Sequence, residues 1–411
     1  MSLSTALNRV PVQPIAAGLV GAITGFASTF AIVIAGLRAV GATETQAASG
    51  LLILCVFQGL IAMILSVRTR TPLSFSWSTP GAALLIAAHS TTSNFAAAVG
   101  AFIVCGLLIA ATGLWPWLAR AITSIPKSIA SAMLAGILLP ICIAPVTAAA
   151  TEPLYALPII GVWLVLYRIA PRWAVPAAMV VTISIIVLTA PALGNAVIAP
   201  QLSVVLPVFD PFVIVSLGLP LYIVTMAGQN VPGFAVLATF GYPPPKAAPI
   251  LIGSGLLSAI GALFGGHAIN LAALSAALMA GPDAHPLPGR RWIAATAGGV
   301  FYLVLGVGAA AATALVAASP PVLITAIAGL ALLGALLGAI TAALENPAQR
   351  MPAIVTFVVV ASGVVIGGVG SAFWGLLVGG VVLAWLSWPV LSYSVLSYSV
   401  LSHSLLSRHR Q

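Results

Sequence analysis

Charged side chains are scarce in this chain: only 5% of its 411 residues are Asp, Glu, Lys or Arg, and 61% are hydrophobic. A soluble domain of this length could not cover its surface with so few charges. The composition therefore excludes a soluble globular protein and predicts an all-α polytopic membrane protein. The formal net charge of +9 does not indicate a nucleic-acid partner, because the basic residues lie singly between apolar runs.

Cysteine is also rare. Cys55, Cys105 and Cys142 each lie inside an apolar run, at no metal or redox spacing, so we interpret them as small packing residues. The sequence predicts no metal site and no cofactor. It also contains no His-Glu-x-x-His motif, and Gly253-Ser-Gly255 lacks the spacing of a nucleophile motif. We therefore expect a protein that is not an enzyme, with a membrane enzyme as the remote alternative.

Acidic residues are missing from the middle of the apolar runs. Glu152, Asp210, Asp283 and Glu345 lie at the ends of runs or between them. His267 is the ionisable group that we expect at membrane depth, where such a residue is a functional candidate by default. The alternative is a neutral histidine satisfied by a backbone carbonyl.

Long apolar runs are abundant, and about 20 such residues span a bilayer. The first run, after Arg9, resembles a signal peptide but has no clear cleavage site, so we take it as the first helix. Runs bounded by charges, proline or polar clusters give fourteen predicted segments, at 14–38, 45–66, 73–89, 94–117, 125–149, 152–169, 173–190, 211–239, 247–263, 267–280, 291–317, 320–343, 351–368 and 371–390.

The basic residues test this count. With the N-terminus in the cytoplasm, only Arg38 of the 14 Lys and Arg residues falls outside, and both termini are cytoplasmic. In a twelve-segment alternative the short third and tenth segments do not cross the membrane. This alternative separates the basic residues less well between the two sides. The cytoplasmic residues are Arg9, Arg68, Arg70, Arg120, Lys127, Arg168, Arg172, Lys246, Arg290, Arg291, Arg350, Arg408 and Arg410.

Weak internal sequence similarities indicate two inverted repeats of seven segments. The stretch 135–139 resembles 328–332, and the short third segment matches the short tenth, at offsets of about 190 to 200 residues. Short, interrupted segments at equivalent positions are the best sequence indicator of a transporter's binding site.

The third segment carries a helix start in its middle. The stretch 74–78 alternates Ser with aromatics, which predicts extended chain, and Thr79 followed by Pro80 predicts an N-cap and a first helical residue. The tenth segment has Gly265-Gly266 before His267, and we expect Asn270 to cap its helix. The two half-helices would point their N-termini at each other near the midplane, where they favour an anion.

Helix ends alone cannot offset the dehydration of a carboxylate, so side-chain donors are needed. Ser28 and Thr29 are weaker candidates, since Ser and Thr in membrane helices often bond back to their own helix. Phe26 and Phe30 have packing as their alternative role. The predicted substrate-binding residues are Ser76, Trp77, Ser78, Thr79, Gln229, Asn230, His267, Asn270, Phe26 and Phe30.

Energetics favour a co-transported proton. Moving one negative charge inward against the membrane potential costs about 2.3 kcal/mol per 100 mV. A proton cancels that charge, and we expect His267, or the substrate carboxylate itself, to carry it.

Several ungapped blocks, covering about residues 10 to 388, resemble the benzoate:proton symporter family. They are 77–85 (WSTPGAALL), 132–139 (AMLAGILL), 219–233 (LPLYIVTMAGQNVPG), 284–286 with 291–292 (AHP, RW) and 370–375 (GSAFWG). The resemblance implies a carrier in the bacterial cytoplasmic (inner) membrane that imports benzoate or a similar aromatic carboxylate with protons. It further implies the fold of uracil permeases and sulfate-type anion transporters, often dimeric through a gate domain.

By that resemblance, 1–122 and 208–318 form a substrate-carrying core domain, and 123–207 and 319–390 form the gate. Uracil-type relatives carry acids in segments eight and ten, where this chain has Gln229, Asn230, His267 and Asn270. That departure favours an anionic substrate. The low-complexity tail 391–411 has no expected role in transport. The alternative function is an uncoupled anion channel or exchanger for small carboxylates on the same fold.

Overall fold

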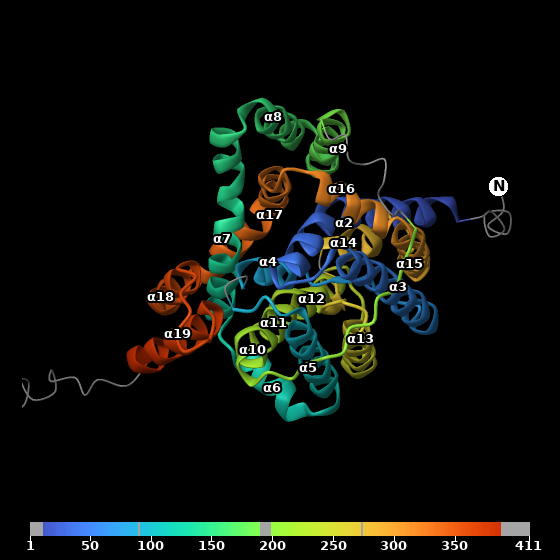
Figure 1. Ribbon diagram of the computed structural model, residues 1–411. Helices are drawn as coiled ribbons and strands as arrows, with labels where there is room; N and C mark the ends of the chain where they lie inside the picture. Colours follow the sequence, from blue (N-terminus) through green and yellow to red (C-terminus); the bar gives the residue numbers. More distant parts are fainter. Residues whose placement is uncertain (1–10, 89–90, 190–198, 273, 388–411) are drawn as a thin grey trace, which may run out of the picture.

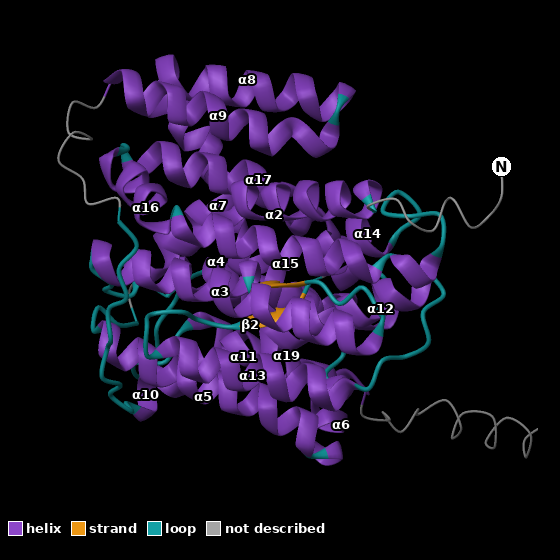
Figure 2. Cartoon of the chain, turned by 90° about the vertical axis from the view of Figure 1, so that its right-hand side faces the viewer, coloured by secondary structure: helices purple, strands orange, loops and turns teal. Residues whose placement is uncertain are grey.

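The computed structural model describes residues 11–88, 91–189, 199–272 and 274–387. Within these ranges the chain is almost entirely helical (Figure 1). One two-stranded sheet lies at the centre, enclosed by helices on all sides of the view in Figure 2. His89 and the tail 391–411 lie outside the described residues.

The helices and strands follow the apolar runs of the sequence. The first half contains α2 (Val12–Ala39), α3 (Glu44–Thr69), β1 (Phe75–Trp77), α4 (Thr79–Ala87), α5 (Phe95–Leu114), α6 (Pro116–Ser124), α7 (Lys127–Thr151), α8 (Pro153–Ile169) and α9 (Pro171–Thr189). The second half contains α10 (Pro211–Val213), η2 (Ile214–Gly218), α11 (Leu219–Thr225), η3 (Met226–Asn230), α12 (Val231–Thr239), α13 (Ala247–Ala262), β2 (Ile269–Leu271), α14 (Leu274–Ala280), η4 (Pro288–Arg290), α15 (Trp292–Val307), α16 (Ala309–Ala318), α17 (Pro321–Leu344), η5 (Pro347–Gln349), α18 (Arg350–Ala361) and α19 (Ser371–Ser387).

Polar residues between the runs start several of these helices. Thr43 and Gln46 form a reciprocal capping box at the start of α3, and the Asn94 side chain accepts from Ala96 N at the start of α5. Asp210 accepts from two backbone N–H groups at the start of α10. These caps satisfy donors that an apolar sequence cannot satisfy by itself.

Six described helical stretches are long and apolar enough to cross a membrane. They are α2, α3, α5, α7, the run Pro211–Thr239 and Val322–Leu344. The run Pro288–Val307 with Ala309–Ala318 adds a seventh if its 55° bend is counted as one span. The protein is therefore a multi-pass membrane protein, while the fourteen-segment count stays a prediction.

Two predicted segments differ in detail, and one short helix was not predicted. Segment eleven is broken at Gly308, and α6 is a separate short helix that we did not predict. Segment thirteen ends at Ala361 instead of 368, because Gly363, Gly367 and Gly368 have φ values of +65°, +59° and +79° that turn the chain. Uniformly apolar composition hides such turns.

Helices pack closely where glycines face each other. α3 lies against α15 and α5 against α13, and α7 runs along α17 and α18 (Figure 1). A Cβ on Gly59 would lie 2.6 Å from the Gly299 carbonyl oxygen, and a Cβ on Gly106 would lie 2.6 Å from Ala259 N. No hydrophobic driving force acts between helices in lipid, so the close packing that these small residues allow stabilises the helix pairs instead. The three cysteines are buried and free, as their interpretation as packing residues requires.

Candidate functional site

The two extended stretches pair with each other in a two-stranded sheet, which we call the ribbon. β1 and β2 are antiparallel, with Phe75 opposite Leu271, Ser76 opposite Asn270 and Trp77 opposite Ile269. Hydrogen bonds from Ser78 N to Ala268 O (2.8 Å) and from Ala272 N to Ser74 O (2.9 Å) extend the ladder. The sequence patterns predict that the third and tenth segments lie near each other but do not predict this pairing. Each strand satisfies backbone groups of the other that no water could reach in a membrane interior.

The start of α4 corrects one predicted residue role. Ser78, not Thr79, is the N-cap: its side chain accepts from Gly81 N at 3.1 Å, and Thr79 and Pro80 are the first two helical residues. Ser78 Oγ also accepts from Thr225 Oγ1 at 2.8 Å. Ser78 is fully buried, so it holds the turn from strand to helix.

The tenth segment corrects a second role. Asn270 lies in β2 and not at the start of α14, so it is not the cap of that helix. Its amide Nδ2 donates to Leu271 O at 3.0 Å, while its Oδ1 is buried with no hydrogen-bond partner among the described residues. Residue 273, just before α14, is outside the described ranges.

Glycine lets this segment approach its neighbours, as predicted. Gly265 has φ +88°, and a Cβ there would lie 2.8 Å from the Gln46 carbonyl oxygen. A Cβ on Gly266 would lie 2.9 Å from Ile53 Cγ2. Side chains at these positions would push the strand away from α3.

His267 is fully buried beside the ribbon. The Ala268 N–H donates to its Nδ1 at 2.6 Å, and its Nε2 has no partner among the described residues. The ring meets Phe102 edge-on, with centroids 6.4 Å apart. Nδ1 also lies 3.2 Å from Ala268 O, so it accepts from the Ala268 N–H in one tautomer and donates to Ala268 O in the other.

The adjacent amides Gln229 and Asn230 have separate environments. Both lie in the π turn η3, which precedes Pro232, a residue that cannot donate to the carbonyl four residues before it. Asn230 is buried, and its Oδ1 accepts from Leu271 N at 2.9 Å, which ties η3 to β2. Gln229 is half-buried and faces a cavity.

This cavity of about 300 Å³ collects part of the predicted site, and we call it the ribbon cavity. α2, β1, α4, η3, α14 and α15 supply its walls. The predicted residues that line it are Ser76, Trp77, Thr79 and Gln229, together with Ser28 and Thr29 of α2. The residues Ser78, Asn230, His267 and Asn270 are not among those that line it.

Ser28 and Thr29 follow the alternative that we considered for them. Their hydroxyls donate to Thr24 O (2.6 Å) and Gly25 O (2.8 Å) of the same helix. Thr29 Oγ1 also accepts from Trp77 Nε1 at 3.0 Å, and this bond orients the indole.

The aromatic residues divide between two cavities. Phe26 and Phe30 stack on each other with centroids 5.1 Å apart and line a second, apolar cavity of about 930 Å³ against α8, α9 and α16. Phe26 also meets Trp77 edge-on at 5.9 Å. The two phenylalanines therefore support the wall of the ribbon cavity from behind.

Tyr302 belongs to this site but is not among the predicted residues. Its ring meets Trp77 edge-on at 6.1 Å, and the residue lines the ribbon cavity from α15. A Cβ on Gly25 would collide with the Tyr302 hydroxyl, so this glycine makes room for it. The available signal was a single phenol inside an otherwise apolar segment.

The ribbon cavity thus combines two aromatic faces with hydroxyl and amide donors, and none of its described lining residues is acidic. Donors can hold an oxyanion and aromatic faces can hold a ring, so the chemistry suits a small aromatic anion.

Known proteins match nearly the whole chain. Residues 8–385 match the family profile described as benzoate membrane transport protein. The inner membrane protein YdcO of Escherichia coli is 38% identical over 378 residues, which cover 91% of this chain and 96% of that protein. The benzoate membrane transport protein of Acinetobacter baylyi is 35% identical over 321 residues, which cover 77% and 80%.

Among solved structures, the fold is similar to the transmembrane domain of the cyanobacterium bicarbonate transporter BicA. The TM-score is 0.58 at 17% sequence identity, covering 91% of this chain and 99% of that one. At that identity the likeness concerns the fold alone. From the family profile and the two relatives, this chain belongs to the benzoate membrane transport protein family, a family of membrane transporters.

Proposed function

We propose that this protein imports benzoate or a similar aromatic carboxylate together with a proton, by alternating access. The observation that carries the proposal is the ribbon cavity, where Ser76, Trp77, Thr79 and Gln229 meet Tyr302. Its volume of about 300 Å³ is at the small end of ligand pockets, which suits a ligand with a single ring.

The carboxylate would bind at the start of α4. Gly81 N and Ala82 N already donate to Ser78, and Pro80 has no N–H, so the N–H of Thr79 is the first-turn donor left for a ligand. The hydroxyls of Thr79 and Ser76 and the Gln229 amide supply further donors. The helix end contributes about 0.3–1 kcal/mol, up to about 2 when partly buried, so these side chains must offset most of the dehydration cost.

The ring would lie against Trp77. The Thr29 hydroxyl and the edges of Phe26 and Tyr302 hold the indole in one orientation. A fixed aromatic face reduces the ordering cost of binding.

The proton has two candidate carriers, His267 and the substrate carboxylate. His267 Nδ1 lies 2.6 Å from Ala268 N and 3.2 Å from Ala268 O, so it accepts from the first when it carries no proton and donates to the second when it does. Protonation of His267 would therefore change the backbone contact beside β2. This link between proton and ribbon is the reason to keep His267 as a candidate, although it does not line the cavity.

The membrane arrangement belongs to the same proposal. Fourteen segments in two inverted repeats, with both termini cytoplasmic, are supported by the distribution of Lys and Arg and by the internal similarities of the sequence. A bacterial inner-membrane location is supported by the relative YdcO. In this arrangement α2–α5 and α10–α16 form the core, α7–α9 and α17–α19 form the gate, and two protomers associate through their gates.

Uptake of labelled benzoate into proteoliposomes tests the proposal. An inward proton gradient should drive accumulation above equilibrium, and a protonophore should abolish it. Equilibration without accumulation would instead support the uncoupled channel or exchanger.

The variant His267→Gln separates the two proton carriers. If His267 carries the proton, the variant keeps benzoate exchange but loses accumulation driven by the gradient. Unchanged accumulation would assign the proton to the substrate carboxylate. Phe102→Leu, which alters the ring facing His267, is the packing control and should keep the coupling.

A further inference from the structure

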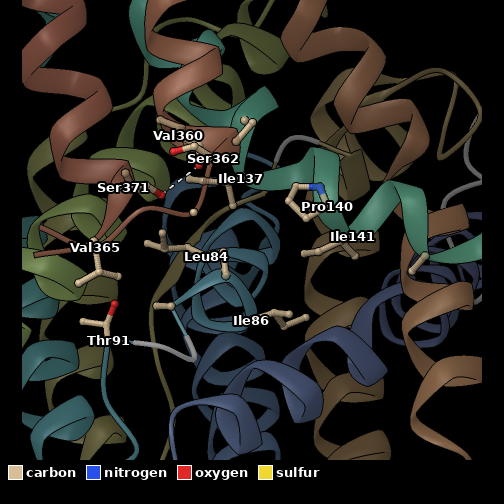
Figure 3. A pocket seen from close by; sticks show the side chains of 18 of the residues that line it. Leu84, Ile86, Thr91, Ile137, Pro140, Ile141, Val360, Ser362, Val365 and Ser371 are labelled. Carbon is tan, nitrogen blue, oxygen red and sulfur yellow. Dashed lines mark hydrogen bonds between the residues drawn. The ribbon is translucent and has the colours of Figure 1, made fainter. Parts of the chain in front are cut away.

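A third cavity lies at the opposite end of α4 from the ribbon cavity. This cavity of about 490 Å³ lies between α4 and η2 on one side and α7, α17, α18 and α19 on the other (Figure 3). Leu84 and Ile86 of α4 face Ile137 and Pro140 of α7 across it. We call it the distal cavity. Its volume is within the range of small-molecule pockets.

The lining of the distal cavity is apolar and uncharged. Among the described residues that line it, the polar side chains are all hydroxyls. Ser216 and Ser371 donate their protons to main-chain carbonyls 2.9 and 3.0 Å away. A hydroxyl that has donated its proton still offers lone pairs, so these two serines present acceptors to a ligand. The other hydroxyls are those of Thr91, Thr147, Thr325 and Ser362.

An anion is therefore disfavoured in the distal cavity. No described lining residue carries a positive charge, and the acceptor oxygens would repel a carboxylate. The cavity also lies at the C-terminal end of α4, where the helix dipole is negative. The ribbon cavity at Thr79 lies at the positive end of the same nine-residue helix. The N-terminal end of α4 thus favours an anion, and its C-terminal end disfavours one.

We propose that the distal cavity binds an uncharged aromatic molecule with a hydrogen-bond donor, such as a neutral aromatic amide or a protonated aromatic acid. Its ring fills the apolar space, and its donor reaches a serine oxygen such as that of Ser371. The ligand would lie between the helices assigned to the core and those assigned to the gate, so it would hold them together and inhibit transport. The inhibitory part rests on the proposed function; the binding part does not.

Benzamide is the probe, because it matches benzoate in shape but stays neutral and donates N–H. It should raise the melting temperature of the purified protein and lower the maximal rate of benzoate uptake without changing the half-saturation concentration. Benzenesulfonate, which stays anionic, should instead compete with benzoate.

Ala144→Phe, on α7, fills the distal cavity and should abolish both effects of benzamide. The matched control Val146→Phe lies on the same helix but outside the cavity, with 71% of its surface exposed, and should keep both. Ser371→Ala is a milder change and should weaken benzamide about fivefold, the loss expected for one hydrogen bond, with the half-saturation for benzoate unchanged.

Three results would overturn the proposal. Benzamide could compete with benzoate, or it could fail to stabilise the wild type. It could also act on Ala144→Phe and Ser371→Ala as strongly as on the wild type. If the protein does not transport benzoate at all, the melting temperatures with benzamide still decide whether the site exists. Failure of the transport function and failure of this site are thus separate results.

Discussion

The two segments that pair at the centre of the molecule have similar backbones and different side-chain environments. Each runs as a strand followed by a short helix, of nine residues in α4 and seven in α14. Ser76 and Thr79 of the first segment face the ribbon cavity. The polar residues of the second, His267 and Asn270, are fully buried, each with one atom that has no partner among the described residues. Similar backbones therefore do not imply equal environments: the first segment presents hydroxyls to the ribbon cavity, and the second keeps its polar groups inside the protein.

Removal of Trp77 should have the largest effect. The indole is 1% exposed and bonds to Thr29, so Trp77→Ala should cost about 3–5 kcal/mol of stability and abolish benzoate uptake. Thermal unfolding in detergent and proteoliposome uptake measure the two losses. Trp115→Ala, at a residue 67% exposed, is the control and should change neither. A stable, active Trp77→Ala protein would show that the first segment does not form the cavity wall.

Substitutions of the two adjacent amides should have different effects, one on stability and the other on benzoate binding. Asn230→Ala leaves Leu271 N without its buried partner and should cost about 1–3 kcal/mol of stability. Gln229→Ala removes a donor of the ribbon cavity and should raise the half-saturation for benzoate about tenfold, with the melting temperature unchanged. Equal effects of the two variants would remove the distinction between their roles.

Ser76 and Asn270 lie opposite each other in the ribbon, and their substitution should have smaller effects on binding and stability. Ser76→Ala should weaken benzoate binding several-fold, the loss of one hydrogen bond to a charged group. Asn270→Ala removes one hydrogen bond and one unpartnered oxygen, so stability should change by less than about 1 kcal/mol. Isothermal titration and thermal unfolding measure both. A loss of binding in Asn270→Ala alone would make the second segment the ligand-contacting one.

An exposed ion pair far from both segments should have the smallest effect. Lys127 Nζ lies 2.6 Å from Glu345 Oε2 and lowers the pKa of that carboxyl. Any contribution to stability is then present above the unfolded pKa of the carboxyl and lost as pH falls through the lower folded pKa. Because both groups are solvated, Lys127→Gln should leave the melting temperature unchanged at pH 7. A clear loss of stability would show that contacts away from the ribbon matter more than proposed.

Part of this site was predictable from local patterns. The Ser-aromatic alternation predicted the extended chain of β1. Pro232 follows the Gln-Asn pair and perturbs the helix there, which is found as the π turn η3. Ser78 and Thr79 are both good caps, however, and proline fits either of the first two helical positions. Ser78 is the cap because the ribbon continues through its N–H to Ala268.

Other features depend on contacts between distant parts of the chain. The pairing of β1 with β2 joins residues almost 200 positions apart, and no local pattern specifies it. Which of two adjacent amides faces the cavity depends on the phase of the π turn. Tyr302 enters the site because Gly25, on another helix, leaves room for its hydroxyl.

A crystal structure with 4-bromobenzoate tests the central claim most directly, because anomalous scattering locates the bromine without assumptions about the pose. The account predicts one bromine peak in the ribbon cavity near Trp77 and Tyr302, with the carboxylate at the N–H of Thr79 and the Gln229 amide. A carboxylate bound at His267 and Asn270, or a peak confined to another cavity, would contradict it.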